Sequence, residues 1–214
     1  NTWGDRSQDT AISESFIKKE LETAKCLGVD VVQIDDGWQE GVTGNSALVK
    51  GGVWEGGYYD FNPEFWKVNT KKFPNGLEAI AEYANDNSIE LGLWFSPDAA
   101  RDYENWQKDV ETLVDLYEKY NIRHFKLDGL RILNKRCERN IVKFLAKVSA
   151  RTGNNVTFNV DVTAGVRLGY LYYKQFGTIF VENRYTDWVN YYPHTTLKNL
   201  WCLSELFPSR RFQF

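Results

Sequence analysis

The repeated change between short apolar segments and amphipathic helical segments limits the fold of this chain more than any other feature. Runs rich in β-branched and aromatic residues, bounded by Gly, Pro, Asn or Asp, predict strands over 29–35, 91–95, 124–127, 156–160 and 178–181. These strands are apolar almost throughout, which is typical of a parallel sheet covered by helices. The sequence therefore predicts an α/β fold.

Helical patterns fill the intervals between these strands. A helix over 16–27 is predicted to follow a Ser13 cap and to end at Gly28. The run 75–78 resembles a capping box in which Asn75 has the capping role before the next helix. Apolar residues at helical spacing predict two further helices, one over 106–120 and one that contains 141–148 and ends near Gly153.

Alternating strands and helices leave two main architectures, an open doubly wound sheet and a closed (β/α) barrel. Neither a G-x-G-x-x-G nor a G-x-x-x-x-G-K-[ST] motif is present, which argues against a nucleotide-binding sheet. Polar residues follow several different strands, as they do in barrel active sites. We therefore expect residues 1–214 to be the catalytic segment of a longer protein, folded as a (β/α)8 TIM barrel. Residues 1–3 would end strand one, 211–214 would begin strand seven, and the eighth unit would be missing.

Composition argues against several classes of function. The 214 residues carry 26 Lys and Arg against 29 Asp and Glu, and a net charge of −3 argues against nucleic acid as a partner. No apolar run reaches membrane-spanning length, so no membrane partner is expected, and no secretion signal is visible. The protein is expected to be soluble, and secreted or periplasmic only if a preceding segment carries a signal. Three scattered Cys and two His argue against a disulfide framework and a His-based zinc site.

The strand over 124–127 ends in a Lys-x-Asp pair, Lys126 and Asp128. Side chains alternate along a strand, so both are expected to point to the same side. An ammonium group beside a carboxylate favours the ionised carboxylate. An ionised, oriented Asp is what a glycosidase with a covalent intermediate needs. A structural ion pair at the rim of the sheet is the alternative interpretation.

Two adjacent carboxylates, Asp35 and Asp36, follow another strand. Like charges repel, so such a pair usually accepts hydrogen bonds from a partner. Sugar hydroxyl groups fit this role and so does a metal ion, while a solvated turn at Asp36-Gly37 is the alternative. Other strand ends carry further polar or aromatic residues, namely Trp94, Asp98, Asn159, Asp161, Glu182, Arg184 and Asp187, with Arg167 further along the chain.

Taken in order, these pieces resemble the catalytic, melibiase-like barrel of clan D glycoside hydrolases and are most similar to the family 36 α-galactosidases. The matching pieces are Asn1-Thr2-Trp3, Ile34-Asp35-Asp36-Gly37-Trp38, Phe73-Pro74-Asn75-Gly76-Leu77, Gly92-Leu93-Trp94-Phe95-Ser96-Pro97, Lys126-Leu127-Asp128 and Thr186-Asp187. The resemblance spans nearly the whole chain. Its most specific parts are the Asp-Asp-Gly-Trp and Lys-x-Asp motifs.

The resemblance implies a role for each matching residue. Asp128 would be the catalytic nucleophile and Asp187 the general acid/base, with Glu182 as a rival for the second role and Arg184 nearby as a steering charge. Lys126 would touch both the sugar and the nucleophile. The full set of implied substrate-binding residues is Trp3, Asp35, Asp36, Trp38, Trp94, Lys126, Asp161 and Arg184.

The implied reaction is a retaining hydrolysis of terminal α-galactosides through a covalent glycosyl-enzyme. The expected partner is an oligosaccharide or glycoside, with no metal and no other cofactor. A raffinose-synthase-type transglycosylase, an α-N-acetylgalactosaminidase, a β-L-arabinopyranosidase, a non-catalytic carbohydrate-binding barrel and a metal-dependent barrel that uses Asp35 and Asp36 remain alternatives. Homo-oligomerisation also stays open.

Two departures from the family pattern bear on the substrate. Asp98 stands where relatives often carry Glu, and residues 161–167 replace a Cys- and Gly-rich loop. In relatives that loop helps to recognise the substituent at the second carbon of the sugar. The sequence therefore leaves the choice of sugar open.

Overall fold

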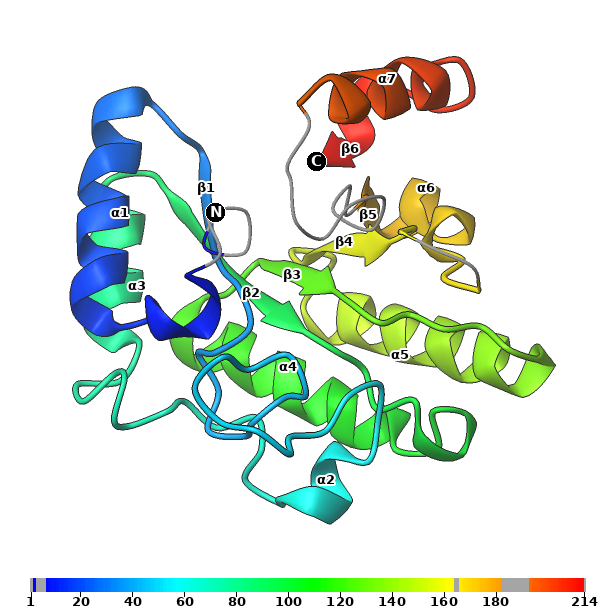
Figure 1. Cartoon of the computed structure of the whole chain (residues 1–214), viewed down its shortest axis with the longest axis horizontal. Helices are drawn as coiled ribbons and strands as arrows, with labels where there is room; N and C mark the ends of the chain where they lie inside the picture. Colours follow the sequence, from blue (N-terminus) through cyan, green and yellow to red (C-terminus); the bar gives the residue numbers. More distant parts are fainter. Residues whose placement is uncertain (1, 3–6, 164–165, 182–192, 214) are drawn as a thin grey trace.

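The computed structural model describes residues 2, 7–163, 166–181 and 193–213. Within this part, six parallel strands form one curled sheet in the order β1-β2-β3-β4-β5-β6 (Figure 1). The strands are β1 (Val31–Ile34), β2 (Glu90–Phe95), β3 (His124–Leu127), β4 (Thr157–Asp161), β5 (Gly177–Phe180) and β6 (Phe212–Gln213). Sequence order equals spatial order, which is the arrangement of strands in a (β/α) barrel.

Helices and short 3-10 turns connect the strands. The α-helices are α1 (Glu14–Leu27), α2 (Tyr58–Phe61), α3 (Glu78–Asp86), α4 (Trp106–Tyr120), α5 (Lys135–Arg151), α6 (Tyr173–Phe176) and α7 (Pro193–Ser204). The 3-10 turns are η1 (Gln8–Thr10), η2 (Ala100–Asp102), η3 (Gly169–Leu171) and η5 (Ser209–Arg211). Helices α1, α3, α4 and α5 follow one another along the outer side of the curled sheet (Figure 1). The described part is thus an α/β half-barrel. No helix in it is long and apolar enough to span a membrane.

The strand register separates an apolar outer face from a polar inner face. Leu93, Phe125 and Phe158 lie side by side across β2, β3 and β4, and all three are fully buried. One position further along, Trp94, Lys126 and Asn159 are side by side. Because side chains alternate along a strand, this second row points to the opposite face, the inside of the curl.

The core lies between the outer face of the sheet and the helices. Phe144 of α5 is fully buried, with its ring centroid 6.3 Å from that of Phe95 in β2 and 6.1 Å from that of Phe158 in β4. Apolar burial of this kind stabilises the fold by roughly 25 cal/mol per Å² of surface removed from water. Packing on one face therefore leaves the other face available for polar groups.

The helix ends test the capping predictions. The Ser13 hydroxyl accepts a hydrogen bond from the Phe16 N–H at 3.3 Å, and Gly28 ends α1 with a left-handed φ of 68°, as predicted. The predicted capping role of Asn75 is wrong, because α3 begins at Glu78 with Leu77 as its N-cap residue. The Asn75 side chain instead donates to the carboxylate of Glu14 at 3.1 and 3.2 Å and links the start of α3 to α1.

Candidate active site

Acidic side chains from three strands meet at the carboxyl end of the sheet, on its inner face. Asp35 follows β1 directly, Asp128 follows β3 directly, and Asp161 ends β4. The register pairs Leu127 with Val160, so Asp128 and Asp161 stand at the same level of neighbouring strands. The carboxyl ends of parallel strands are where (β/α) barrels place their active sites.

Each oxygen of the Asp128 carboxylate has its own partners. Oδ2 accepts a hydrogen bond from the Trp94 indole Nε1 at 3.1 Å. Oδ1 accepts one from the Gly129 backbone N–H at 2.7 Å and lies 3.8 Å from Nη1 of Arg167. The side chain keeps 14% of its surface exposed, so the carboxylate is oriented but still accessible.

Lys126 pairs with a different carboxylate from the one expected. Its ammonium group lies 2.8 Å from Oδ2 of Asp35, and it also lies 4.8 Å from the centre of the Phe180 ring. The cation that the described contacts place beside Asp128 is Arg167. The expectation that Lys126 forms its ion pair with Asp128 is therefore corrected, because the lysine reaches across the inner face from β3 to the end of β1.

Asp36 differs sharply from its neighbour Asp35. Its side chain is buried, with Oδ1 accepting from Gln39 at 2.7 Å and Oδ2 from the Thr43 hydroxyl at 2.5 Å. Burial raises the pKa of Asp36 to about 7, against the lowering effect of these hydrogen bonds. Both oxygens already have protein donors, so a sugar hydroxyl would have to share or replace them.

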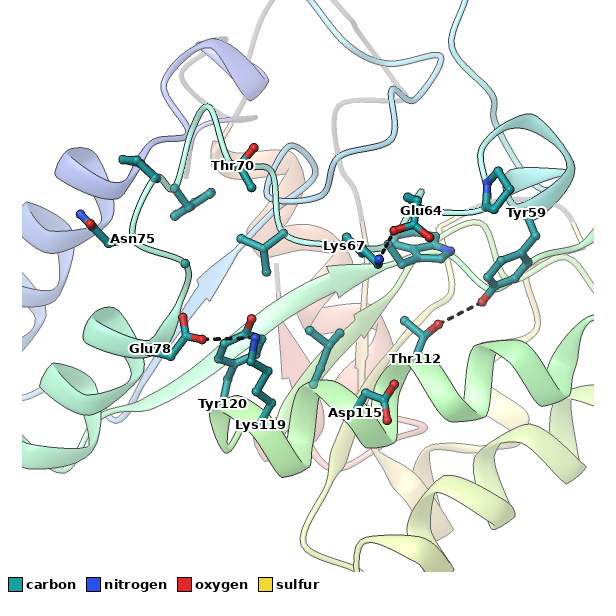
Figure 2. A pocket seen from close by; sticks show the side chains of 17 residues that line it. Tyr59, Glu64, Lys67, Thr70, Asn75, Glu78, Thr112, Asp115, Lys119 and Tyr120 are labelled. Atoms are coloured by element: carbon teal, nitrogen blue, oxygen red, sulfur yellow. Dashed lines mark hydrogen bonds and ion pairs between the residues drawn. The ribbon is translucent and has the colours of Figure 1, made fainter.

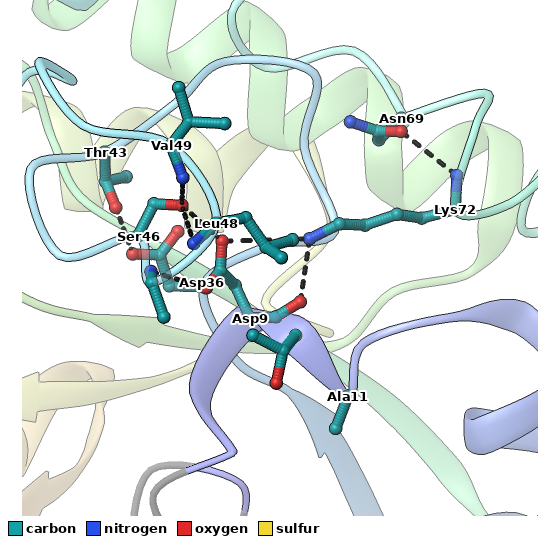
Figure 3. A network of polar contacts seen from close by, with 12 residues as sticks. Asp9, Ala11, Asp36, Thr43, Ser46, Leu48, Val49, Asn69 and Lys72 are labelled. Atoms are coloured by element: carbon teal, nitrogen blue, oxygen red, sulfur yellow. Dashed lines mark hydrogen bonds and ion pairs between the residues drawn. The ribbon is translucent and has the colours of Figure 1, made fainter.

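Asp36 belongs to a wider polar network that fixes the loop after β1 (Figure 3). Asp9 accepts hydrogen bonds from the Ser46 hydroxyl at 2.5 Å and the Ala47 N–H at 2.8 Å. Lys72 donates to the Asp9 backbone oxygen at 3.0 Å. These contacts tie residues 46–47 to the turn η1 and hold the loop against the start of the chain.

Asp161 is fully buried, and both oxygens of its carboxylate bind neighbouring protein groups. Its Oδ2 lies 3.0 Å from Nη1 of Arg167 and accepts from the Gly129 N–H at 3.1 Å, while Oδ1 accepts from the Thr163 N–H at 2.8 Å. Burial and the nearby charge of Asp128 raise the pKa of Asp161, and Arg167 opposes this shift. The predicted contact between Asp161 and a sugar has no exposed surface to support it here.

Of the three tryptophans in the predicted site, the structure describes Trp38 and Trp94, and these two have different roles. Trp94 lies on the inner face and reaches Asp128 with its indole nitrogen, but only 1% of its surface is exposed, so its predicted contact with a sugar has little surface to support it. Trp38 is fully buried among core aromatic rings, and its indole N–H donates to the Trp94 backbone oxygen at 2.7 Å. Trp38 therefore supports Trp94 from behind, where it has no surface to offer a sugar.

The sequence alone did not single out two residues at this site, Trp54 and Glu55, because they lie in the long irregular segment between β1 and α3. The Trp54 ring stacks on Trp94, with centroids 6.2 Å apart and planes 16° apart. Glu55 forms ion pairs with Arg131 at 2.6 Å and with Arg167 at 3.1 Å. Their only signal in the sequence is an aromatic and glycine-rich run over 51–59.

Several predicted residues lie outside the described part of the chain. These are Trp3, Glu182, Arg184 and Asp187, so the general acid/base and two of the sugar contacts stay predictions. Among the residues that are described, no group of three His, Cys, Asp or Glu side chains is arranged to hold a metal ion.

A separate groove of about 650 Å³ lies between α4 and the segment over 59–78 (Figure 2). Its walls include the ion pair of Glu64 with Lys67 and that of Glu78 with Lys119. None of the predicted site residues lines it. Trp66 separates the two regions, because it lines the groove and its ring centroid lies 5.7 Å from that of Trp94.

Comparisons with known proteins point to one group of enzymes. The chain is 33% identical over 98 residues to the α-galactosidase Mel36A of Lactobacillus acidophilus, and the match covers 45% of this chain and 11% of that protein. It is 31% identical over 86 residues to the α-galactosidase AgaA of Geobacillus stearothermophilus, covering 40% of this chain and 10% of the relative. The matched stretches thus span about a tenth of these relatives.

Solved structures extend the similarity of the fold. The crystal structure of a variant of the GH36 α-galactosidase AgaA from Geobacillus stearothermophilus, in complex with raffinose, superposes with a TM-score of 0.64 at 19% identity. The superposition covers 94% of this chain and 32% of that one. The Melibiase family model matches residues 1–109 of the 214. Because this match takes in just over half of the sequence, the chain belongs to the Melibiase family.

Proposed function

We propose that the protein containing this chain is a retaining glycoside hydrolase that releases galactose from terminal α-galactosides. The observation that carries the proposal is the environment of Asp128, a carboxylate at the carboxyl end of β3 whose two oxygens are oriented separately by Trp94 and by Gly129 and Arg167. An accessible, oriented carboxylate on a rigid strand is the form that a nucleophile for covalent glycosyl transfer takes.

The reaction follows from two carboxyl groups with opposite tasks. Asp128 attacks the anomeric carbon while Asp187 protonates the oxygen of the leaving group, so the glycosidic bond breaks as the Asp128–carbon bond forms. Asp187 then takes a proton from water, and the hydroxide oxygen displaces Asp128 from the anomeric carbon. Two inversions retain the configuration. Glu182 is the alternative proton donor.

The remaining inner-face groups suit the binding of a sugar. Asp35 is half of an ion pair with Lys126 and keeps 15% of its side-chain surface exposed, so it can accept hydrogen bonds from hydroxyl groups. Only 1% of the surface of Trp94 is exposed, so its contribution is the indole N–H that orients Asp128. Relatives named α-galactosidases, and a similar structure that holds raffinose, support an α-galactoside as the substrate.

We also propose that residues 1–214 form one catalytic segment of a closed (β/α)8 barrel. The curled parallel sheet with strands in sequence order supports this, as does the superposition of 94% of the chain on part of a GH36 enzyme.

The test is hydrolysis of an aryl α-galactoside by the full-length protein and by Asp128→Ala. We expect a loss of roughly 10⁴-fold or more in kcat/KM, because removal of a nucleophile leaves only binding and the remaining polar groups. Asp115→Ala is the matched control, since Asp115 is an exposed acid on α4 and should leave the rate unchanged.

A panel of substrates separates the alternatives. Aryl α-N-acetylgalactosaminide and β-L-arabinopyranoside test other sugars, and product analysis with added acceptor sugars tests transfer. Activity that survives in Asp128→Ala would refute the nucleophile, and activity lost on addition of a chelator would favour the metal-dependent alternative.

A further inference from the structure

The segment over 53–58, which runs from the loop after β1 to the first residue of α2, holds two adjacent residues that lie one contact away from Asp128. Neither residue belongs to the Asp-Asp-Gly-Trp or Lys-x-Asp motif. Trp54 and Glu55 each contact a side chain that in turn contacts one oxygen of the Asp128 carboxylate.

Trp54 is connected to Asp128 through an aromatic stack with Trp94. The ring of Trp54 lies nearly parallel to that of Trp94, with 6.2 Å between centroids. Trp94 donates its indole N–H to Oδ2 of Asp128 at 3.1 Å. Trp66 also packs on Trp94, with 5.7 Å between ring centroids, and only 1% of Trp94 is exposed, so the indole is enclosed by its neighbours. The stack therefore limits rotation of the donor that holds Oδ2.

Glu55 is connected to Asp128 through ion pairs of Arg167. Oε1 of Glu55 lies 3.1 Å from Nη2 of Arg167, and Oε2 lies 2.6 Å from Nη1 of Arg131. The Arg167 guanidinium also pairs with Asp161 at 3.0 Å and lies 3.8 Å from Oδ1 of Asp128. Only 17% of the Glu55 side chain and 11% of the Arg167 side chain are exposed, so solvent screens the Glu55–Arg167 pair weakly, whereas the Arg131 side chain is 41% exposed.

The backbone of the segment is fixed independently of these side chains. The Glu55 N–H donates to the Tyr58 hydroxyl at 3.1 Å, and that hydroxyl donates to Ser96 at 2.8 Å. The Gly57 N–H donates to Oδ1 of Asp98 at 2.6 Å. Gly56 has a φ of 131°, and a Cβ there would lie 2.4 Å from the Ala100 backbone nitrogen.

Glu55 itself has a φ of 60°, a conformation that costs a non-glycine residue energy. Such strain persists only where surrounding contacts impose it, and it concentrates at functional sites. The contacts at Gly57 and Tyr58 impose it here. They aim the Glu55 side chain at Arg131 and Arg167.

We propose that the 53–58 segment is a positioning element for Asp128, with Trp54 acting through Trp94 and Glu55 acting through Arg167. Together they fix both carboxylate oxygens in the orientation from which one of them attacks the anomeric carbon. The inference rests on the proposed function, in which Asp128 is the nucleophile. Trp54 and Glu55 are positioning residues, because they act on Asp128 only through other side chains.

The experiment compares Glu55→Gln and Trp54→Ala in the full-length protein with the parent, using an aryl α-galactoside. A misplaced nucleophile slows the chemical step, so kcat should fall by roughly 10–100-fold in each variant while KM changes by less than about threefold. Glu55→Asp and Trp54→Phe should restore part of the loss. Glu64→Gln is the matched control, since Glu64 pairs with Lys67 on the exposed groove and should leave kcat unchanged.

Crystal structures of Glu55→Gln and Trp54→Ala provide the second measurement. We expect the Asp128 carboxylate to rotate and its contact with Trp94 or Arg167 to lengthen. An Asp128 that keeps both contacts in both variants overturns the inference, as does an unchanged kcat or a rise in KM alone. If the parent hydrolyses no glycoside, the proposed function fails, and these structures still decide whether the segment positions Asp128.

Discussion

At the scale of residues, the surroundings of a carboxylate decide its use more than its place in a motif. Asp35 and Asp36 are neighbours in the chain, yet Asp35 pairs with Lys126 on the inner face while Asp36 is buried against Gln39 and Thr43. Alternation along the chain sends the two side chains in different directions. Asp35 is therefore the better candidate for direct contact with a sugar, and Asp36 organises the loop behind it.

The buried Asp36 predicts a dependence of stability on pH. Its pKa rises from an ordinary value of 3.8 to about 7 on folding, so the folded state holds a proton that the unfolded chain has released. The contribution of Asp36 protonation to the free energy of unfolding should therefore be complete below about pH 4. It should fall as pH rises toward 7.

Urea unfolding between pH 4.5 and 7.5 checks this prediction with Asp36→Asn as the comparison. The variant should lose a slope of up to about 1.4 kcal/mol per pH unit, the limit for one proton. Slope that remains in the variant belongs to other buried carboxyl groups, such as Asp109, whose pKa burial raises to about 8. Equal slopes in the parent and the variant would contradict the assignment.

At the scale of elements, the strands and the main helices follow from local pattern. The predicted strand over 124–127 coincides with β3, and the predicted helix over 106–120 coincides with α4, because apolar spacing alone fixes them. The predicted capping role of Asn75 is wrong because its side chain instead donates a hydrogen bond to Glu14, a residue far away in the sequence. Residues 53–58 could not be predicted, since their role depends on partners far along the chain.

The N-terminus of α5 gives a prediction at this scale. The Asn134 side chain accepts hydrogen bonds from the N–H groups of Arg136 at 2.8 Å and Cys137 at 3.0 Å. Asn134→Ala should therefore lower the free energy of unfolding by about 1 kcal/mol. Asn134→Ser also loses the bond to Asp102 but keeps an acceptor, so most of the stability should remain. Equal losses in both variants, measured by urea unfolding, would show that the cap contributes nothing.

At the scale of the whole molecule, the two faces of one curled sheet have different roles, stability on the outer face and polar chemistry on the inner face. Apolar packing of α5 on the outer face holds the strands, and the strand ends carry the polar groups of the inner face. The predicted α/β fold with parallel strands is confirmed for the described residues. Pairings on the inner face, such as Lys126 with Asp35, depend on the curl of the sheet and could not be read from spacing along one strand.

A substitution at Phe144 tests whether packing of α5 on the outer face stabilises the fold. Phe144→Ala should lower the free energy of unfolding by about 3–5 kcal/mol, because it leaves a cavity against Phe95 and Phe158. Val142→Ala on the same helix is the control, since Val142 is 41% exposed and should cost about 0.5 kcal/mol or less. A small loss at Phe144, measured by thermal or urea unfolding, would mean that α5 is not part of the core.

The most direct test of the central claim is to trap the covalent intermediate. The full-length protein would be incubated with a fluorinated, activated α-galactoside, digested with protease and analysed by mass spectrometry. The account predicts one labelled peptide, with the sugar attached to Asp128, and no labelled peptide in Asp128→Ala. A sugar attached to any other residue, or hydrolysis of an aryl α-galactoside that is not slowed by the reagent, would contradict the assignment of Asp128 as the nucleophile.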